Sequence, residues 1–331
     1  MNLNPSLTAA PPTLTPDQAA GLAAQHFGIT GSLTQLTSER DLNFRLTTAK
    51  AAYVLKLANP AEPPEVTDFQ TQALLHLDPT PLPVPRIIRS LTGEACAATE
   101  HGTLRLLTWL HGQPQYQTPK TPAQRRNLGS MAARLTLGLH GFTHPAAAHV
   151  LQWDIKHAAN LRPLLPMIPP ELQSLATQTL NRFDALAPEL ASCRTQVVHN
   201  DLNPHNVLVN PDSPDQIVGI LDFGDMVLTP LICDAAVAAC YQIDPAAPLQ
   251  SLMDFTQAYH AILPLTAQEA HLLPDLVATR MLTSLTIASA RVAKFPQNAA
   301  YILRNFKGAH LGLTALTALD RAEVQHAMEA L

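Results

Sequence analysis

The chain has 331 residues, of which 47% are hydrophobic and 14% charged, with a formal net charge of −5. This composition supports a folded core and excludes a disordered chain, and the net charge excludes bulk attraction to nucleic acid or an anionic membrane. The four cysteines form no C-x-x-C pair, and the N-terminus shows no secretory signal pattern, so a reducing cytoplasm is expected. No uninterrupted apolar stretch is long enough to span a membrane.

The first third of the chain is predicted to be rich in β-structure. Residues 1–16, with many Pro and Thr, are expected to form a loose lead-in, and Thr15–Pro16 marks a helix start. Short apolar runs separated by polar turns then predict strands, with one helix between the third and fourth. The strands are expected at 33–36, 43–47, 52–57, 84–88 and 104–109, and the helix at 66–77. Residues 17–108 are therefore predicted to form a small antiparallel sheet lobe.

Beyond a hinge near residues 108–113, helical periodicity dominates. Pro188 and Pro274 are expected to end helices, because proline lacks the amide hydrogen that a helix interior needs. Helices are predicted at 125–139, 171–186, 234–241, 249–262, 267–273, 275–290 and 299–308. The fold class is therefore α+β, with a helical lobe at 109–331 and a ligand cleft expected between the two lobes.

Residues 199–209 read H-N-D-L-N-P-H-N-V-L-V and precede a second apolar run that ends in D-F-G at 222–224. Turn-forming residues at 210–215 predict that the two apolar runs pair as an antiparallel hairpin. The return strand brings Asp222 to the same end of the hairpin as Asn206, and Asp201 can face the same cavity. Phosphoryl transfer needs one carboxylate to align the attacking hydroxyl and two oxygen ligands to hold Mg²⁺.

Two other interpretations compete at this hairpin. In the first interpretation, the acids are ordinary turn and surface residues. An acid beside an apolar strand, however, costs folding free energy unless it has a partner. In the second, His199, Asp201 and His205 bind a transition metal, but the oxygen-rich set suits Mg²⁺ better. We expect His199 to hydrogen-bond the backbone near Asp222, and Asp234 either to cap the next helix or to brace the catalytic loop.

These motifs resemble the aminoglycoside phosphotransferase and choline kinase group, which shares the protein-kinase-like fold. The stretches 38–44, 53–60, 68–70 and 223–227 look more like a sub-branch that contains hydroxylysine kinase, and the homoserine kinase sub-branch is also similar. The resemblance covers most of the chain. It implies a small-molecule kinase that uses Mg²⁺ and either ATP or GTP as the phosphoryl donor.

The resemblance also implies residue roles. Asp201 would be the catalytic base, and Asn206 and Asp222 would ligate Mg²⁺. Lys56, on the third strand, would pair with the α- and β-phosphates; on its own, this lysine is equally well explained as one that extends into solvent from an edge strand. The nucleobase would lie against the hinge, near Thr108 and Leu110.

Two departures from the group's pattern concern phosphate binding. The hairpin at 36–46 has no glycine, so Ser38 and Asn43 are expected to supply side-chain hydrogen bonds where a Gly-rich loop would use its backbone. The helix after Lys56 would normally present a Glu to that lysine. Gln72 stands at that place, with Asp68 as the other candidate, and an amide cannot complete the ion pair.

The acceptor is expected to be an amino-acid alcohol such as hydroxylysine. Arg280 and Arg291 are candidates for its carboxylate, unless both form salt bridges at the surface or between helices. Asp225 is either a contact for its ammonium group or an acid that supports the neighbouring metal ligand. Trp109 and Trp153 could line a pocket, but the core is the place we expect for each. The alternatives are a kinase for homoserine, choline, a sugar or an aminoglycoside, and a non-catalytic nucleotide-binding pseudokinase. Choline would need an aromatic cage, for which 5% aromatic residues is a poor supply.

Overall fold

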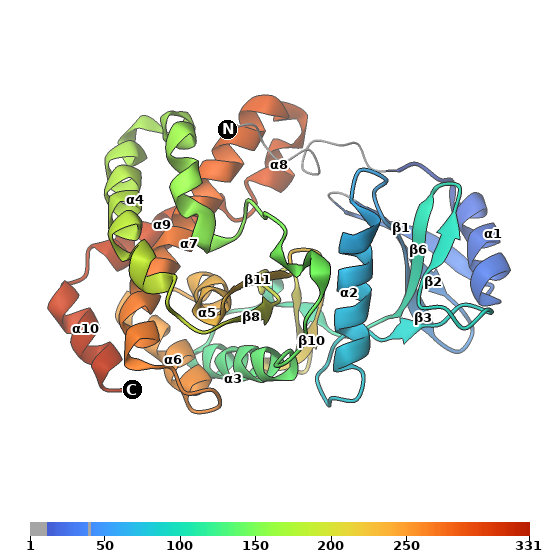
Figure 1. Ribbon diagram of the computed structural model, residues 1–331, viewed down its shortest axis with the longest axis horizontal. Helices are drawn as coiled ribbons and strands as arrows, with labels where there is room; N and C mark the ends of the chain where they lie inside the picture. The colour runs from blue at the N-terminus through green and yellow to red at the C-terminus, as the bar shows by residue number, and fades with distance from the viewer. Residues whose placement is uncertain (1–11, 39–40) are drawn as a thin grey trace.

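The computed structural model describes residues 12–38 and 41–331 and has the expected α+β architecture, with a small antiparallel sheet lobe and a larger helical lobe (Figure 1). The N-terminal lobe contains α1 Pro16–Phe27, β1 Ser32–Leu36, β2 Leu42–Thr47, β3 Ala52–Leu57, α2 Pro64–Leu77, β4 Ile87–Ile88, β5 Ala97–Thr99 and β6 Gly102–Thr108. The sheet order is β1-β2-β3-β6-β4, with β5 pairing β6.

The two faces of this sheet differ because successive side chains on a strand point to opposite sides. One face packs against α1 through a cluster that includes Phe44, Leu55 and Leu106. The register pairs Asn43 with Lys56, and Lys56 with Arg105. These three polar residues therefore form a row across the other face.

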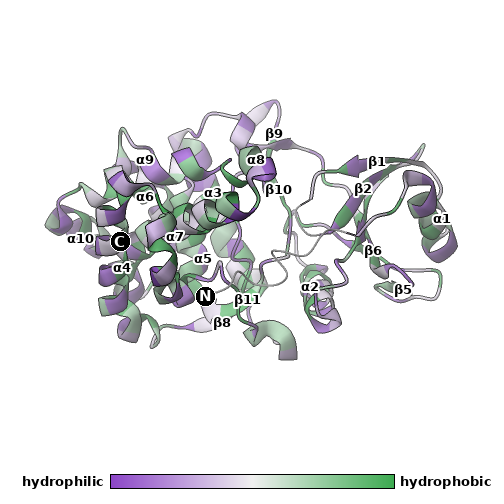
Figure 2. Cartoon of the chain, turned by 90° about the horizontal axis from the view of Figure 1, so that it is seen from above, coloured by the Kyte–Doolittle hydropathy of each residue, from purple (hydrophilic) through white to green (hydrophobic). Residues whose placement is uncertain are grey.

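Helix α2 joins the two lobes. Its residues Phe69, Leu74 and Leu77 belong to the same hydrophobic cluster as the core of the helical lobe. The ring of Phe69 stacks on that of Phe142 at 5.9 Å between centroids. Seen from above, α2 lies between the sheet on one side and the helices on the other (Figure 2).

The helical lobe surrounds α7, most of whose residues are buried. Its helices are α3 Pro122–Gly138, α4 Pro170–Leu190, α5 Leu231–Cys240, α6 Pro248–His260, α7 Ala267–Lys294, α8 Ala299–Ile302, α9 Phe306–Thr317 and α10 Arg321–Glu329, with 3₁₀ segments η2 Gln115–Gln117, η3 Pro145–Ala148, η4 Ile155–Met167 and η5 Pro296–Asn298. Its strands are β7 Gln113–Pro114, β8 Thr195–Val198, β9 Val207–Asn210, β10 Ser213–Ile220 and β11 Val227–Pro230. They form a three-stranded sheet, β10-β9-β7, and a two-stranded sheet, β11-β8.

Several predicted boundaries were wrong, mostly at prolines. Pro274 lies inside the single helix α7 and Pro188 inside α4, so neither ends a helix. Burial of the apolar face on both sides of Pro274 offsets the lost hydrogen bond, which costs about 3 kcal/mol in an isolated helix. The strand expected at 84–88 shrinks to Ile87–Ile88 because Pro85 cannot donate to a ladder.

Other elements differ in smaller ways. The helix expected at 299–308 is split into α8 and α9, and the short strand β5 was not predicted. The four cysteines are free, and three of them are buried. Within residues 12–38 and 41–331, no helix is both long enough and apolar enough to cross a bilayer.

Candidate active site

The loop between β8 and β9 is fixed by His199. Its Nδ1 accepts a hydrogen bond from the Asp201 amide at 3.2 Å, so Nε2 carries the hydrogen and donates to the Leu221 carbonyl at 3.0 Å. Burial lowers the pKa of His199 and keeps the ring neutral. His199 thus ties the loop to the residue before Asp222, as expected. Both ring nitrogens are occupied, so the transition-metal interpretation is wrong.

Asn200 is the second fixed point of this loop. Its φ of 63° is left-handed, a conformation that asparagine tolerates better than most residues. Its buried backbone N–H donates a hydrogen bond to Asp234 Oδ1 at 2.7 Å. Helix α5 begins at Leu231, so Asp234 lies in its first turn and is not the cap residue. Of the two expected roles for Asp234, bracing is correct and capping is wrong.

Asp234→Ala is expected to destabilise the protein by about 1–3 kcal/mol, because the buried backbone N–H of Asn200 would lose its acceptor. Urea unfolding measures this change. Asp234→Asn, which keeps an acceptor oxygen, serves as the control and should lose less. An Ala variant as stable as the parent protein would contradict the bracing role.

Asp201 is held beside Asn206. Its Oδ2 accepts from Asn206 Nδ2 at 2.7 Å and from Asn203 Nδ2 at 2.9 Å, and the same Asn206 nitrogen lies 3.1 Å from the Asp201 carbonyl. The amide nitrogen of Asn206 therefore faces Asp201, and its Oδ1 faces away. Burial, and then the charge of Asp225, raise the pKa of Asp201 to about 7 against the opposing effect of Arg280. Such a value suits a group that must take up a proton near neutral pH.

Asp222 lies beside Asn206, as the hairpin prediction requires. The Leu221 amide donates to the Asn206 carbonyl at 2.7 Å and closes the end of the hairpin. Asp222 has a left-handed φ of 54°, and its Oδ1 accepts from the Gly224 amide at 3.1 Å. Asn206 Oδ1 and the Asp222 carboxylate are hard oxygen donors that line the same cleft, so these residues fit Mg²⁺.

Lys56 has a partner that the sequence did not indicate. Its Nζ lies 3.0 Å from Asp41 Oδ2 and 3.8 Å from Asp222 Oδ1. Burial disfavours the ammonium charge, but Asp41 and Asp222 outweigh it and raise the pKa of Lys56. The lysine is therefore charged, and it points into the cleft between the lobes.

The expectation that Gln72 or Asp68 supports Lys56 was wrong. Gln72 is exposed and donates to Asp68, which in turn contacts His144. Successive helical residues are rotated by about 100°, so the α2 face that carries Gln70 into the cleft directs Gln72 away from it.

The cleft between the lobes has a volume of about 650 Å³. It brings the residues expected to bind the nucleotide together with those expected to act as base and metal ligands: Ser38, Asn43, Lys56, Thr108, Leu110, Asp201, Asn206 and Asp222. The Oδ1 atom of Asn43 is buried without a hydrogen-bond partner in the protein. Trp109 also lines this cleft, with the guanidinium of Arg45 4.5 Å from its ring centre, so its expected place in the core was wrong.

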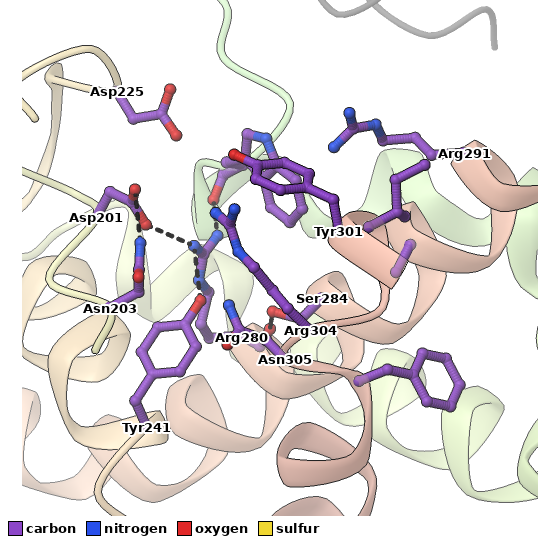
Figure 3. A pocket seen from close by; sticks show the side chains of 14 residues that line it. Asp201, Asn203, Asp225, Tyr241, Arg280, Ser284, Arg291, Tyr301, Arg304 and Asn305 are labelled. Carbon is purple, nitrogen blue, oxygen red and sulfur yellow. Dashed lines mark hydrogen bonds and ion pairs between the residues drawn. The ribbon is translucent and has the colours of Figure 1, made fainter. Parts of the chain in front are cut away.

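A second pocket of about 80 Å³ adjoins the catalytic loop (Figure 3). It is lined by Asp225, Arg280 and Arg291, which the sequence had singled out, and by Trp153, which was expected in the core. Two residues that were not predicted, Tyr301 and Arg304, line both cavities. In the sequence, only their spacing of three residues within a predicted helix indicated that the two side chains could lie on one face.

Arg280 is held by the protein itself. Its Nη1 donates to the Trp153 carbonyl at 2.9 Å, and its Nη2 lies 3.4 Å from the Tyr241 hydroxyl and 3.7 Å from Asp201 Oδ1. It is only 2% exposed, and its guanidinium lies 5.1 Å from the Trp153 ring centre. Arg280 thus places a positive charge directly beside Asp201.

Comparison with known proteins agrees with this geometry. Residues 32–272 match the profile of the phosphotransferase enzyme family (APH). The chain belongs to this phosphotransferase family. Because members of such families transfer a phosphoryl group to a hydroxyl, the expectation of a phosphotransferase with an alcohol acceptor is confirmed.

Individual relatives of the phosphotransferase support the narrower resemblance. It is 29% identical to a hydroxylysine kinase of Danio rerio, over 95% of this chain and 94% of the relative, and 27% identical to one of Mus musculus, over 90% and 88%. Its fold matches that of an amicoumacin kinase solved with AMP-PNP, Ca²⁺ and its ligand Ami, with a TM-score of 0.68 at 15% identity over 94% of this chain and 97% of the other. The protein-kinase-like fold is therefore confirmed.

Proposed function

We propose that the phosphotransferase moves the γ-phosphoryl group of ATP or GTP to the hydroxyl of an amino-acid alcohol such as hydroxylysine, in a Mg²⁺-dependent reaction. One observation carries this proposal. Asp201 lines both the large cleft and the small pocket, so it stands where a donor in one would meet an acceptor in the other. A catalytic base must have that position in a direct transfer between two bound substrates.

On the donor side, the nucleobase would lie against Thr108 and Leu110, with the phosphates toward Lys56. Asn206 and Asp222 would hold Mg²⁺, which, when bound, offsets the negative charge of the phosphates. The amicoumacin kinase with the same fold was solved with AMP-PNP and Ca²⁺, which supports a nucleotide and a divalent cation as ligands here.

On the chemical side, the acceptor hydroxyl would attack the γ-phosphorus as the bond to the β-γ bridging oxygen breaks. Asp201 would accept the hydroxyl proton, and the nucleoside diphosphate would leave. Asn203 and Asn206 fix one carboxylate oxygen of Asp201 and leave the other on the side of Arg280. Catalysis would rest on this positioning, because the loose transition state needs little covalent help.

On the acceptor side, the small pocket offers charges of both signs. Arg291 and Arg304 would pair with the carboxylate of an amino acid, and Asp225 with its ammonium group. Arg280 adds positive charge to the pocket. Its guanidinium already donates to Trp153 and Tyr241, which hold it beside Asp201, so we assign it mainly to Asp201. The sequence identity of 27–29% to two hydroxylysine kinases supports the same class of acceptor.

Purified protein with Mg²⁺ and either ATP or GTP should be assayed against hydroxylysine, homoserine, choline and an aminoglycoside, with lysine as the control that lacks the hydroxyl. Hydroxylysine is expected to give the highest kcat/KM and lysine no transfer. Arg291→Met should raise KM for hydroxylysine about tenfold, the loss expected for one charged contact, and leave the nucleotide KM unchanged. A better rate with choline or an aminoglycoside would contradict the acceptor class. Nucleotide binding without transfer to any acceptor would favour the pseudokinase.

A further inference from the structure

The carboxylate that contacts Lys56 belongs to Asp41, the residue just before β2. Asp41 Oδ2 lies 3.0 Å from Lys56 Nζ, and the two side chains are only 12% and 14% exposed. Asp41 Oδ1 accepts a hydrogen bond of 3.0 Å from the amide of Asn59, just beyond β3. One carboxylate therefore connects the beginning of β2 to the end of β3 and fixes the lysine between them.

Helix α2 presents a neutral group to this site. Gln70 Oε1 accepts from Arg105 Nη2 at 3.0 Å. The other contacts of the Arg105 guanidinium, at 3.4–3.5 Å, are to the Thr67 carbonyl and the Thr71 hydroxyl, which are also neutral. Arg105 is only 2% exposed, so these neutral groups of α2 hold a buried cation.

The charges of two cations act on Asp41. Burial raises its pKa, but Lys56, and then Arg105, outweigh that effect and lower it, so the carboxylate stays ionised. A lysine side chain has four rotatable bonds and three donor hydrogens. One donor on a fixed carboxylate restrains the side chain and leaves the others for a phosphate.

We infer that Asp41 is the positioning residue for Lys56, in place of the helix acid expected from the resemblance. This inference rests on the proposed function, because it assumes that Lys56 binds the donor phosphates. Asp41 lines the same cleft as Ser38 and Asn43, so the strand pair that borders the phosphates also holds the lysine that contacts them.

Four variants test the inference. Asp41→Asn is expected to lower kcat/KM for the nucleotide about 10- to 100-fold, the loss of a charge-assisted contact, with the KM for hydroxylysine unchanged. Lys56→Met should lose at least as much. Asp68→Asn, which removes an exposed acid of α2, is the matched control and should behave as the parent. Adding Gln72→Glu to Asp41→Asn should restore nothing, because residue 72 is exposed on the far side of α2.

Two measurements compare these variants without any acceptor: the Kd for Mg·ATP from titration calorimetry, and the rate of ATP hydrolysis. The inference is overturned if Asp41→Asn matches the parent protein while Lys56→Met is impaired, or if Gln72→Glu restores activity. If Lys56→Met also matches the parent, the proposed role of Lys56 fails as well. If Asp41→Asn does not fold, Asp41→Glu is used instead. Its displaced carboxylate should raise the nucleotide KM and leave the acceptor KM unchanged. Equal effects on the two KM values would overturn the inference.

Discussion

Asp201→Asn is expected to reduce kcat by about 10²–10⁴-fold, the usual contribution of a positioned acid–base group. The amide can still accept the hydrogen bonds from Asn203 and Asn206 with its one oxygen, but it cannot take the proton of the acceptor hydroxyl. Steady-state transfer to hydroxylysine at saturating Mg·ATP measures the loss. The nucleotide KM should change little, because Asp201 is not among the residues proposed to hold the donor.

Folding should survive this substitution. Burial raises the pKa of Asp201 to about 7, so its ionised form is disfavoured in the folded protein, and the cost grows as the pH rises from the unfolded value toward 7. Removing the charge should therefore leave the melting temperature at pH 8 unchanged or higher. Asp212→Asn, at an exposed turn of the hairpin, is the control and should keep full activity. An Asp201→Asn enzyme that transfers phosphate at the parental rate would rule out this residue as the base.

Asp222→Ala is expected to abolish Mg²⁺-dependent binding of the nucleotide, with Kd for ATP rising at least about 100-fold, or about 2.7 kcal/mol. The carboxylate is one of two oxygen groups expected to hold Mg²⁺, and it also lies 3.8 Å from Lys56 Nζ. Asn206 alone would leave the ion with a single neutral protein ligand. Calorimetric titration with ATP in the presence of Mg²⁺ measures the change.

The parent protein in EDTA provides the reference for this variant. If Asp222 acts through the metal, the parent in EDTA and the variant in Mg²⁺ should bind ATP about equally weakly. A variant that binds Mg·ATP as tightly as the parent would remove Asp222 from the set of metal ligands. Asp212→Asn again serves as a charge control, because it removes one carboxylate from the same hairpin outside the cleft.

The sequence by itself was sufficient to predict the hairpin of β9 and β10 and the side chains that meet at its end. Apolar runs on both sides of a turn-rich segment leave one favourable pairing, and that pairing places Asp222 beside Asn206. The contact of His199 with the Leu221 carbonyl follows from the same strand pairing, and the contact of Asp201 with Asn206 spans only five residues. Such features depend on strand periodicity and short spacings, which a single sequence displays directly.

The charged partners of Lys56 and Asp201 could be decided only by the tertiary structure. The partner of Lys56 depends on the register of β2 against β3 and on the rotation of α2, which together favour Asp41 over Gln72. Arg280 meets Asp201 because α7 continues through Pro274, where the local rule predicted a break. At Pro274, burial and packing across the whole fold outweighed a local preference of about 3 kcal/mol, and that balance cannot be read from neighbouring residues.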